Sequence, residues 1–233
     1  MTLAYGRTVS ADLPTADDGA DRERIGVGEL VERIATESAA RHRYLFGLAG
    51  PPGSGKSTVA ARIAAALGGV VVPMDGFHLH NAELERRGLS EVKGAPETFD
   101  ADGFVRLVRR LRQADGPVLA PSFDRLADRT VDAAITVVPS ARVVIVEGNY
   151  LLLDRPPWAA LAELFDRTGY LAVDDAERVE RLVARHVDHG RSPDGAREFV
   201  LRSDEANATL VTASQHRADV LIDPSRPGPR ASL

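Results

Sequence analysis

The stretch that decides the fold reads Gly50-Pro51-Pro52-Gly53-Ser54-Gly55-Lys56-Ser57-Thr58, and it meets every position of the pattern GxxxxGK[ST]. The apolar residues 44–49 precede it and predict a buried strand. Residues 57–67 follow it, are rich in alanine, and predict a helix. Strand, glycine loop and helix start therefore occur in the order that a phosphate-binding loop requires.

The chemistry of these nine residues explains why the pattern binds phosphate. Glycines let successive backbone N–H groups converge on phosphate oxygens, and the helix N-terminus adds a positive partial charge. Lys56 is expected to reach the β- and γ-phosphates, and the Ser57 hydroxyl to hold Mg²⁺. Lys56 is one of only two lysines in the chain, so composition alone does not explain it. We expect ATP and Mg²⁺ as cofactors; a glycine-rich turn without a ligand is the weaker alternative.

Length and composition limit the classes of protein that remain. With 233 residues and 44% hydrophobic content, the chain is long enough for one sizeable core. We expect a mobile segment at residues 1–24, a single domain at 25–223 and a tail at 224–233. The net charge of -5 disfavours broad binding to nucleic acid or to an anionic membrane.

The absence of cysteine and of long apolar stretches indicates the compartment and the redox chemistry to expect. The absence of cysteine excludes disulfides and thiolate metal sites. Stretches without charge are shorter than the ~18–20 residues that span a bilayer, and no signal peptide is evident. We therefore expect a cytoplasmic protein that acts on a small molecule.

Apolar runs and helical segments alternate along the rest of the chain. The helical segments include residues 101–113 and 175–189, and the β-rich runs lie at residues 70–74, 118–123, 135–138, 143–147, 170–173 and 219–222. This alternation predicts an α/β fold of three layers, α/β/α, with a mostly parallel central sheet.

Two carboxylates stand where predicted strands end, which is where ligands bind in such sheets. Glu147 closes the run Val-Val-Ile-Val at residues 143–146, and we expect it to face Mg²⁺. Asp75 follows residues 70–74, and we expect it to align and deprotonate an attacking hydroxyl. Alternatively, Glu147 caps the following turn or pairs with an arginine, and Asp75 lies in an ordinary turn before glycine. Phe77 and His78 are candidates for the wall of the acceptor pocket.

These segments resemble the P-loop kinases that include uridine kinase, phosphoribulokinase and bacterial type I pantothenate kinase. Residues 74–78, Met-Asp-Gly-Phe-His, are similar to the segment after the second strand, where an Asp is the proposed base. Residues 93–100 are similar to the Gly-x-Pro-Glu-Ser-Tyr-Asp segment of pantothenate kinase, which implies a substrate contact for Glu97. Residues 121–125 resemble the acceptor-side segment after the third strand, which implies a substrate contact for Arg125 as well.

The resemblance also implies a lid at about residues 178–195. Arginines on such a lid close over the triphosphate and offset charge in the transition state. Arg181 and Arg185 are spaced by four and share one helix face, so they are the better candidates. A solvated face of Arg and Glu is the competing interpretation, because 27 of the 29 basic residues are arginine.

The resemblance implies a kinase that transfers phosphate from ATP to the hydroxyl of a metabolite, and its members are often homodimers. Residue 78 is His where uridine and pantothenate kinases carry Tyr, so the chain is nearest the bacterial nucleoside/nucleotide or sugar kinase-like branch. A nucleoside, a sugar or a pantothenate-like alcohol fits this site. The alternatives are a regulatory ATPase and a nucleoside monophosphate kinase, the second of which needs cations such as Arg125, Arg106 and Arg109.

Overall fold

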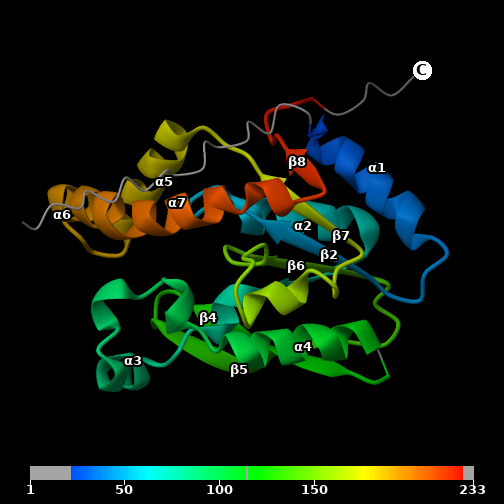
Figure 1. Cartoon of the computed structure of the whole chain (residues 1–233), viewed down its shortest axis with the longest axis horizontal. Helices are drawn as coiled ribbons and strands as arrows, with labels where there is room; N and C mark the ends of the chain where they lie inside the picture. Colours follow the sequence, from blue (N-terminus) through cyan, green and yellow to red (C-terminus); the bar gives the residue numbers. More distant parts are fainter. Residues whose placement is uncertain (1–21, 114, 228–233) are drawn as a thin grey trace, which may run out of the picture.

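The computed structural model describes residues 22–113 and 115–227, which are organised around one six-stranded sheet (Figure 1). Its strand order is β1-β8-β7-β2-β6-β3, and every neighbouring pair is parallel. The strands are β1 (Arg24–Ile25), β2 (Tyr44–Ala49), β3 (Val70–Pro73), β6 (Val143–Gly148), β7 (Arg167–Leu171) and β8 (Val220–Ile222). The α/β fold with a mostly parallel central sheet is confirmed.

Alternation of side chains along the strands builds a core on each face of the sheet. All six residues of β2 are buried, but Leu45 joins one hydrophobic cluster and Phe46 joins the other. Successive side chains of a strand point to opposite faces, so a strand covered on both sides is apolar throughout. Helices α1 (Val27–Ser38) and α2 (Lys56–Leu67) supply residues to the cluster of Phe46.

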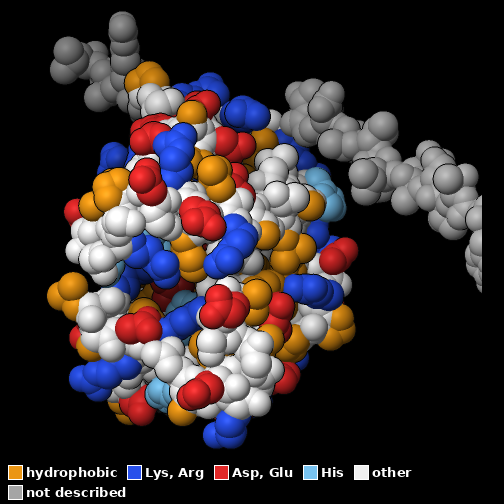
Figure 2. All heavy atoms as spheres, turned by 90° about the vertical axis from the view of Figure 1, so that its left-hand side faces the viewer, with side chains coloured by type: hydrophobic (Ala, Val, Ile, Leu, Met, Phe, Trp, Pro, Cys, Tyr) orange, Lys and Arg blue, Asp and Glu red, His pale blue; other side chains and the backbone are white. Residues whose placement is uncertain are grey.

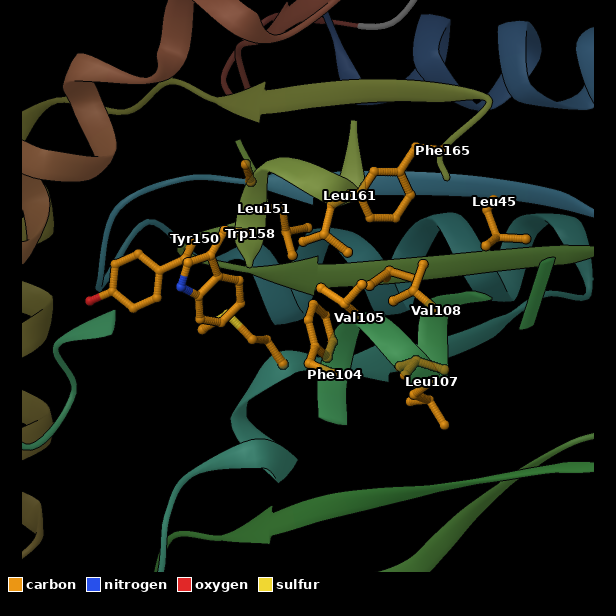
Figure 3. Close-up of a cluster of buried hydrophobic side chains, with 14 of the residues drawn as sticks. Leu45, Phe104, Val105, Leu107, Val108, Tyr150, Leu151, Trp158, Leu161 and Phe165 are labelled. Carbon is orange, nitrogen blue, oxygen red and sulfur yellow. The ribbon is translucent and has the colours of Figure 1, made fainter. Parts of the chain in front are cut away.

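The cluster of Leu45 is built by α4 (Ala101–Gln113) and the 3₁₀ turn η4 (Trp158–Leu161) (Figure 3). Phe104 is fully buried on α4, and its ring lies 6.0 Å from that of Trp158, centroid to centroid. Apolar residues three and four apart give α4 one buried face, which packs on the sheet. Burial of one such aromatic side chain contributes about 1.5–3 kcal/mol.

Two of the predicted strands do not belong to the central sheet. The runs at residues 118–123 and 135–138 form β4 (Val118–Asp124) and β5 (Arg129–Val137), which pair with each other in antiparallel register. The expectation that they continue the β-α alternation is wrong, because only four residues join them and a parallel pair needs a long crossover. This hairpin lies at the lower edge of Figure 1.

The hairpin packs against the 3₁₀ turn η1 (Met74–Phe77), which follows β3. A Cβ at Gly76 would lie 2.4 Å from the Pro121 carbonyl oxygen, so only glycine allows this approach. The hairpin is therefore held directly beside Asp75.

The remaining helices lie mostly towards the left of Figure 1 and carry the expected lid region. They are α3 (Asn81–Arg87), η2 (Ser90–Val92), η3 (Pro96–Thr98), α5 (Asp175–Asp188), α6 (Pro193–Phe199), the π-helical turn η5 (Val200–Asp204), α7 (Glu205–Ala213) and η6 (Gln215–Arg217). Among the described residues, no helix is both long enough and apolar enough to cross a membrane.

The expected terminal segments fall largely on residues 1–21 and 228–233, which lie outside the described part of the chain. The boundary placed at residue 24 differs from the structure in one respect. Arg24 pairs with Leu221 in the sheet, so ordered structure includes a residue assigned to the N-terminal segment. The division into one domain with two terminal segments remains a proposal.

Candidate active site

The register of the central sheet brings the predicted site residues to one edge. Leu48 of β2 lies opposite Glu147 of β6, and Pro73 of β3 lies opposite the same glutamate. The glycine loop starts two residues after Leu48, and Asp75 lies two residues after Pro73. Because the three strands are parallel neighbours, the loop, Glu147 and Asp75 emerge side by side.

The glycine loop packs closely against its own lysine. Lys56 begins α2, is buried, and its Nζ donates a hydrogen bond of 2.9 Å to the Pro51 carbonyl oxygen. Burial lowers the pKa of Lys56 to about 8, although the nearby Glu147 and Asp75 favour its charged form. The negative charge of a bound triphosphate would stabilise the charged form of this buried ammonium group.

The residues expected to hold Mg²⁺ are in direct contact. Ser57 Oγ donates a hydrogen bond of 2.9 Å to Glu147 Oε1. Burial raises the pKa of Glu147, and the charge of Asp75 adds to this effect. A hydroxyl and a carboxylate are hard oxygen donors of the kind that Mg²⁺ accepts together with substrate phosphates. The donor set therefore fits Mg²⁺, which would offset the negative charge of the phosphates when bound.

A cleft of about 990 Å³ joins the phosphate loop to the lid region. Six of the nine loop residues line it, namely Pro52, Gly53, Gly55, Lys56, Ser57 and Thr58, whereas Gly50, Pro51 and Ser54 are buried beside them. Figure 2 views the end of the molecule that faces left in Figure 1, where acidic and basic side chains are intermixed.

Helix α5 supplies arginines to this cleft. Arg181 and Arg185 both line it, as their spacing of four predicts, and burial lowers the pKa of Arg185. Arg181 is paired with Glu177 on its own helix. Arg178 is different, because its side chain is only 1% exposed and lies 2.7 Å from Glu205 in an ion pair. Arg178 therefore ties α5 to α7.

The acceptor half of the cleft is built around Asp75 and His78. Asp75 forms an ion pair with Arg125, which begins the turn of the hairpin. The His78 ring stacks on Phe99 at 4.0 Å between centroids and lies 4.8 Å from Phe123. Burial lowers the pKa of His78 to about 4, so its imidazole is neutral at pH 7.

Two expected acceptor residues are not part of the cleft wall. Phe77 packs its ring 5.2 Å from that of Phe104, centroid to centroid, against the core cluster on that face of the sheet, and Met74, three residues before it on the same side of the 3₁₀ turn, is also buried there. Glu97 is exposed on η3, and it does not line the cleft because its two neighbours take the buried positions. Both assignments to the pocket wall are corrected.

Several residues that line the cleft were not identified from the sequence. Lys93 Nζ donates to Asp128 at 2.7 Å and lies 5.5 Å from the centre of the Phe123 ring. Asn149 follows β6, and Asn207 lies on α7. The scarcity of lysine is a signal that could have identified Lys93, but no local pattern distinguishes these asparagines from those on a surface.

Comparison with known proteins agrees with this geometry. Residues 45–227 match the Phosphoribulokinase / Uridine kinase family. A Schizosaccharomyces pombe protein provisionally named as a uridine kinase is 39% identical over 212 residues, covering 85% of this chain and 90% of that protein. Pantothenate kinase of Clavibacter sepedonicus is 38% identical over 144 residues, covering 58% of this chain and 45% of that enzyme.

A solved structure extends the likeness to the fold. The protein from Silicibacter sp. TM1040, provisionally named as a fructose transport system kinase, has a TM-score of 0.78 and 43% sequence identity. The match covers 84% of this chain and 98% of that chain. With the phosphate loop, the Ser57–Glu147 contact and the family match together, the chain belongs to the phosphoribulokinase/uridine kinase family of ATP-dependent small-molecule kinases.

Proposed function

We propose that this protein transfers the γ-phosphate of ATP to a hydroxyl group of a small metabolite. The observation that carries the proposal is the position of Asp75 beside the phosphate loop but outside the Ser57–Glu147 pair. The cleft thus has one carboxylate on the metal side and a second one on the acceptor side. A kinase needs both, whereas hydrolysis of ATP needs no acceptor-side base.

The geometry of the cleft supports a role for each of these residues in the proposed reaction. Lys56 stabilises the phosphates, and Ser57 with Glu147 would hold Mg²⁺. Asp75 orients the acceptor hydroxyl and takes its proton. Arg181 or Arg185 stabilises the charge on the transferring group when α5 closes over the cleft.

The acceptor comes from the group of hydroxyl compounds that the relatives' names suggest. Those names refer to uridine, to a fructose transport system and to pantothenate. His78, Phe123 and Arg125 line the part of the cleft next to Asp75 and would contact the acceptor.

The structure gives little support to a nucleoside monophosphate kinase. Such an enzyme needs several cations around the acceptor phosphate. Arg106 and Arg109 are exposed on α4 and do not line the cleft, and Arg106 lies 3.9 Å from Asp100. Arg125 is the only one of the three in position. A regulatory ATPase remains the competitor from another class.

The test is ADP release from Mg²⁺-ATP with a panel of sugars, nucleosides, pantothenate and nucleoside monophosphates. We expect one acceptor class to raise the rate, and Asp75→Asn to lower that rate by about 10²-fold or more while ATP affinity stays near normal. Asp102→Asn, at an exposed position on α4, is the matched control and leaves the rate unchanged. A slow rate of ADP release that depends neither on the acceptor nor on Asp75 supports the regulatory ATPase.

A further inference from the structure

Lys93 is the second of the two lysines in the chain, and the proposed reaction gives it no role. Its Nζ donates hydrogen bonds to Asn81 Oδ1 at 2.7 Å and to the two carboxylate oxygens of Asp128 at 2.7 and 2.8 Å. Asn81 Nδ2 donates to Asp128 Oδ2 at 3.0 Å, which closes a ring of three side chains. Asn81, Lys93 and Asp128 are called the Lys93 clamp below.

The clamp joins two segments that enclose the acceptor side of the cleft. Asn81 begins α3 and Lys93 follows η2, whereas Asp128 ends the turn between β4 and β5. Lys93 Nζ also lies 5.5 Å from the centre of the Phe123 ring, which is carried by β4. Lys93 therefore contacts the hairpin both at a strand and at the turn.

The ammonium group of Lys93 is satisfied within the clamp. Its three N–H donors are matched by three oxygen atoms at hydrogen-bond distance. A compact point charge suits this arrangement, whereas the planar fork of arginine, the basic residue at 27 of 29 positions, does not. Burial acts to raise the pKa of the Asp128 carboxyl, but the hydrogen bonds from Lys93 and Asn81 outweigh it and lower that pKa.

The β4–β5 turn depends on the clamp for its conformation. Asp128 has a φ of +49°, a left-handed conformation that residues other than glycine rarely adopt. Leu126 is 91% exposed and the Arg125 side chain is 47% exposed, so packing holds neither residue firmly. The Asp124 carboxylate accepts hydrogen bonds from the Leu126 and Ala127 amides and fixes the start of the turn. The clamp on Asp128 fixes its end.

Arg125 is the residue that this turn presents to the active site. It lies three residues before Asp128 and forms the ion pair with Asp75. Displacement of the turn would therefore move the guanidinium group away from the expected base. Lys93 and Asp128 line the cleft beside this pair, whereas Asn81 lies outside the cleft wall that the described residues form.

We propose that Lys93 is a positioning residue, which holds the β4–β5 turn through Asp128 so that Arg125 stays on Asp75. This inference rests on the proposed kinase function and adds to it a residue that acts through Arg125 rather than on the substrate. The Asp128 side chain is 55% exposed, so solvent screens the clamp and the effect belongs to catalysis more than to stability.

Steady-state kinetics with the best acceptor of the panel test this role. We expect Lys93→Met to lower kcat by about 5-fold with ATP affinity unchanged, because Arg125 then orients Asp75 less often. Asn81→Ala should lower kcat by about 2-fold, although Asn81 lies outside the cleft. Lys93→Arg should not restore the wild-type value. Glu85→Ala, at an exposed position on α3, is the matched control and leaves kcat unchanged.

A double-mutant cycle distinguishes positioning from direct contact with the acceptor. If Lys93 acts through Arg125, Lys93→Met should change kcat by less than about 2-fold in protein that already carries Arg125→Ala. Losses that multiply in the double variant overturn the proposal, because they show that the two residues act independently. Wild-type kinetics for Lys93→Met overturn it as well.

Hydrogen–deuterium exchange tests the clamp without any acceptor. In Lys93→Met, amides in residues 118–137 should exchange about 5-fold faster than in the wild type, while those of α2 keep their rate. Faster exchange in the hairpin without an active acceptor in the panel supports the clamp and contradicts the kinase. Unchanged exchange in the hairpin overturns the clamp, whatever the panel shows. If Lys93→Met also loosens α2, the milder Asn81→Ala decides by the same comparison.

Discussion

Arg125 forms an ion pair with Asp75 across 50 residues of sequence, so the expected base has a cationic partner before any acceptor arrives. Arg125 is carried by the β4–β5 hairpin, and Asp75 by the turn after β3. The pair therefore aligns two separately built parts of the acceptor site. Its strength is moderate because the Arg125 side chain is 47% exposed and solvent screens the interaction.

Removal of the Arg125 side chain is expected to impair catalysis more than stability. In Arg125→Ala, Asp75 loses the group that orients it, and we expect kcat/KM to fall by about 10-fold or more. Arg125→Lys is expected to recover part of this loss, because lysine keeps the charge but lacks the planar fork. Steady-state kinetics measure the effect. Arg129→Ala removes an equal charge at an exposed position of β5, and a similar loss there would contradict the argument.

The buried Lys56 predicts proton uptake on nucleotide binding. With a pKa of about 8 in the free protein, Lys56 is charged at pH 6.5 and mostly neutral at pH 9. Triphosphate binding favours the charged form, so ATP binding at pH 9 should take up a proton and should weaken as pH rises above about 8. Calorimetry in buffers of different ionisation enthalpy measures the uptake.

Lys56→Arg is the control for this effect, because arginine stays charged throughout this range. Equal proton uptake in the wild type and in Lys56→Arg would assign the proton to another group. Lys56→Ala is expected to abolish phosphate transfer and most of the stabilisation by nucleotide.

The same lysine predicts how stability depends on pH without nucleotide. The folded protein lowers the pKa of Lys56 below its ordinary value of 10.5, so between about pH 8 and 10.5 the unfolded chain binds more protons at this residue. The contribution of Lys56 to stability therefore increases with pH across this window. Denaturant unfolding of the wild type and of Lys56→Met at about pH 7 and pH 9 measures this contribution. Lys56→Met should be the more stable of the two at pH 7, because it lacks the buried charge, and its advantage in free energy of unfolding should be smaller at pH 9.

Gly53 is where the phosphate loop meets the lid helix. Its φ is +77°, and a Cβ there would lie 2.7 Å from Leu182 Cγ and 2.9 Å from the Arg178 carbonyl oxygen. Gly53→Ala should therefore displace α5 from the loop and weaken ATP binding by about 10-fold or more. Fluorescent nucleotide titration measures the loss.

Gly88→Ala is a matched control for backbone strain. Gly88 has a φ of +67°, but a Cβ there has no atom within 4 Å. Its cost of about 1 kcal/mol should appear in stability and not in nucleotide affinity. Equal nucleotide binding by Gly53→Ala and the wild type would show that the contact with α5 is unimportant.

Phe104 is the test of the core beneath the acceptor side. The side chain is fully buried between Phe77 and Trp158, so Phe104→Ala should lower the free energy of unfolding by about 3–5 kcal/mol. Arg109→Ala on the exposed face of α4 should change it by less than about 0.5 kcal/mol. Chemical denaturation measures both, and similar values would contradict the packing.

Local sequence was sufficient wherever function depends on neighbours along the chain. The phosphate loop needs consecutive glycines at a helix start, and Arg181 and Arg185 share a helix face by their spacing. Strands that are almost entirely apolar likewise identified a sheet that is covered on both faces. These features follow from backbone geometry over a few residues, so the sequence predicted them.

Tertiary structure decided the acceptor side. The β4–β5 hairpin is separate from the central sheet, Phe77 packs in the core, and Glu97 lies at the surface. Asn207 reached the cleft from α7, and Arg125 paired with Asp75. Such contacts join residues far apart in the chain, and their formation depends on how helices and strands pack. The periodicity of a sequence shows which residues are buried, but it carries no information about which distant side chains meet.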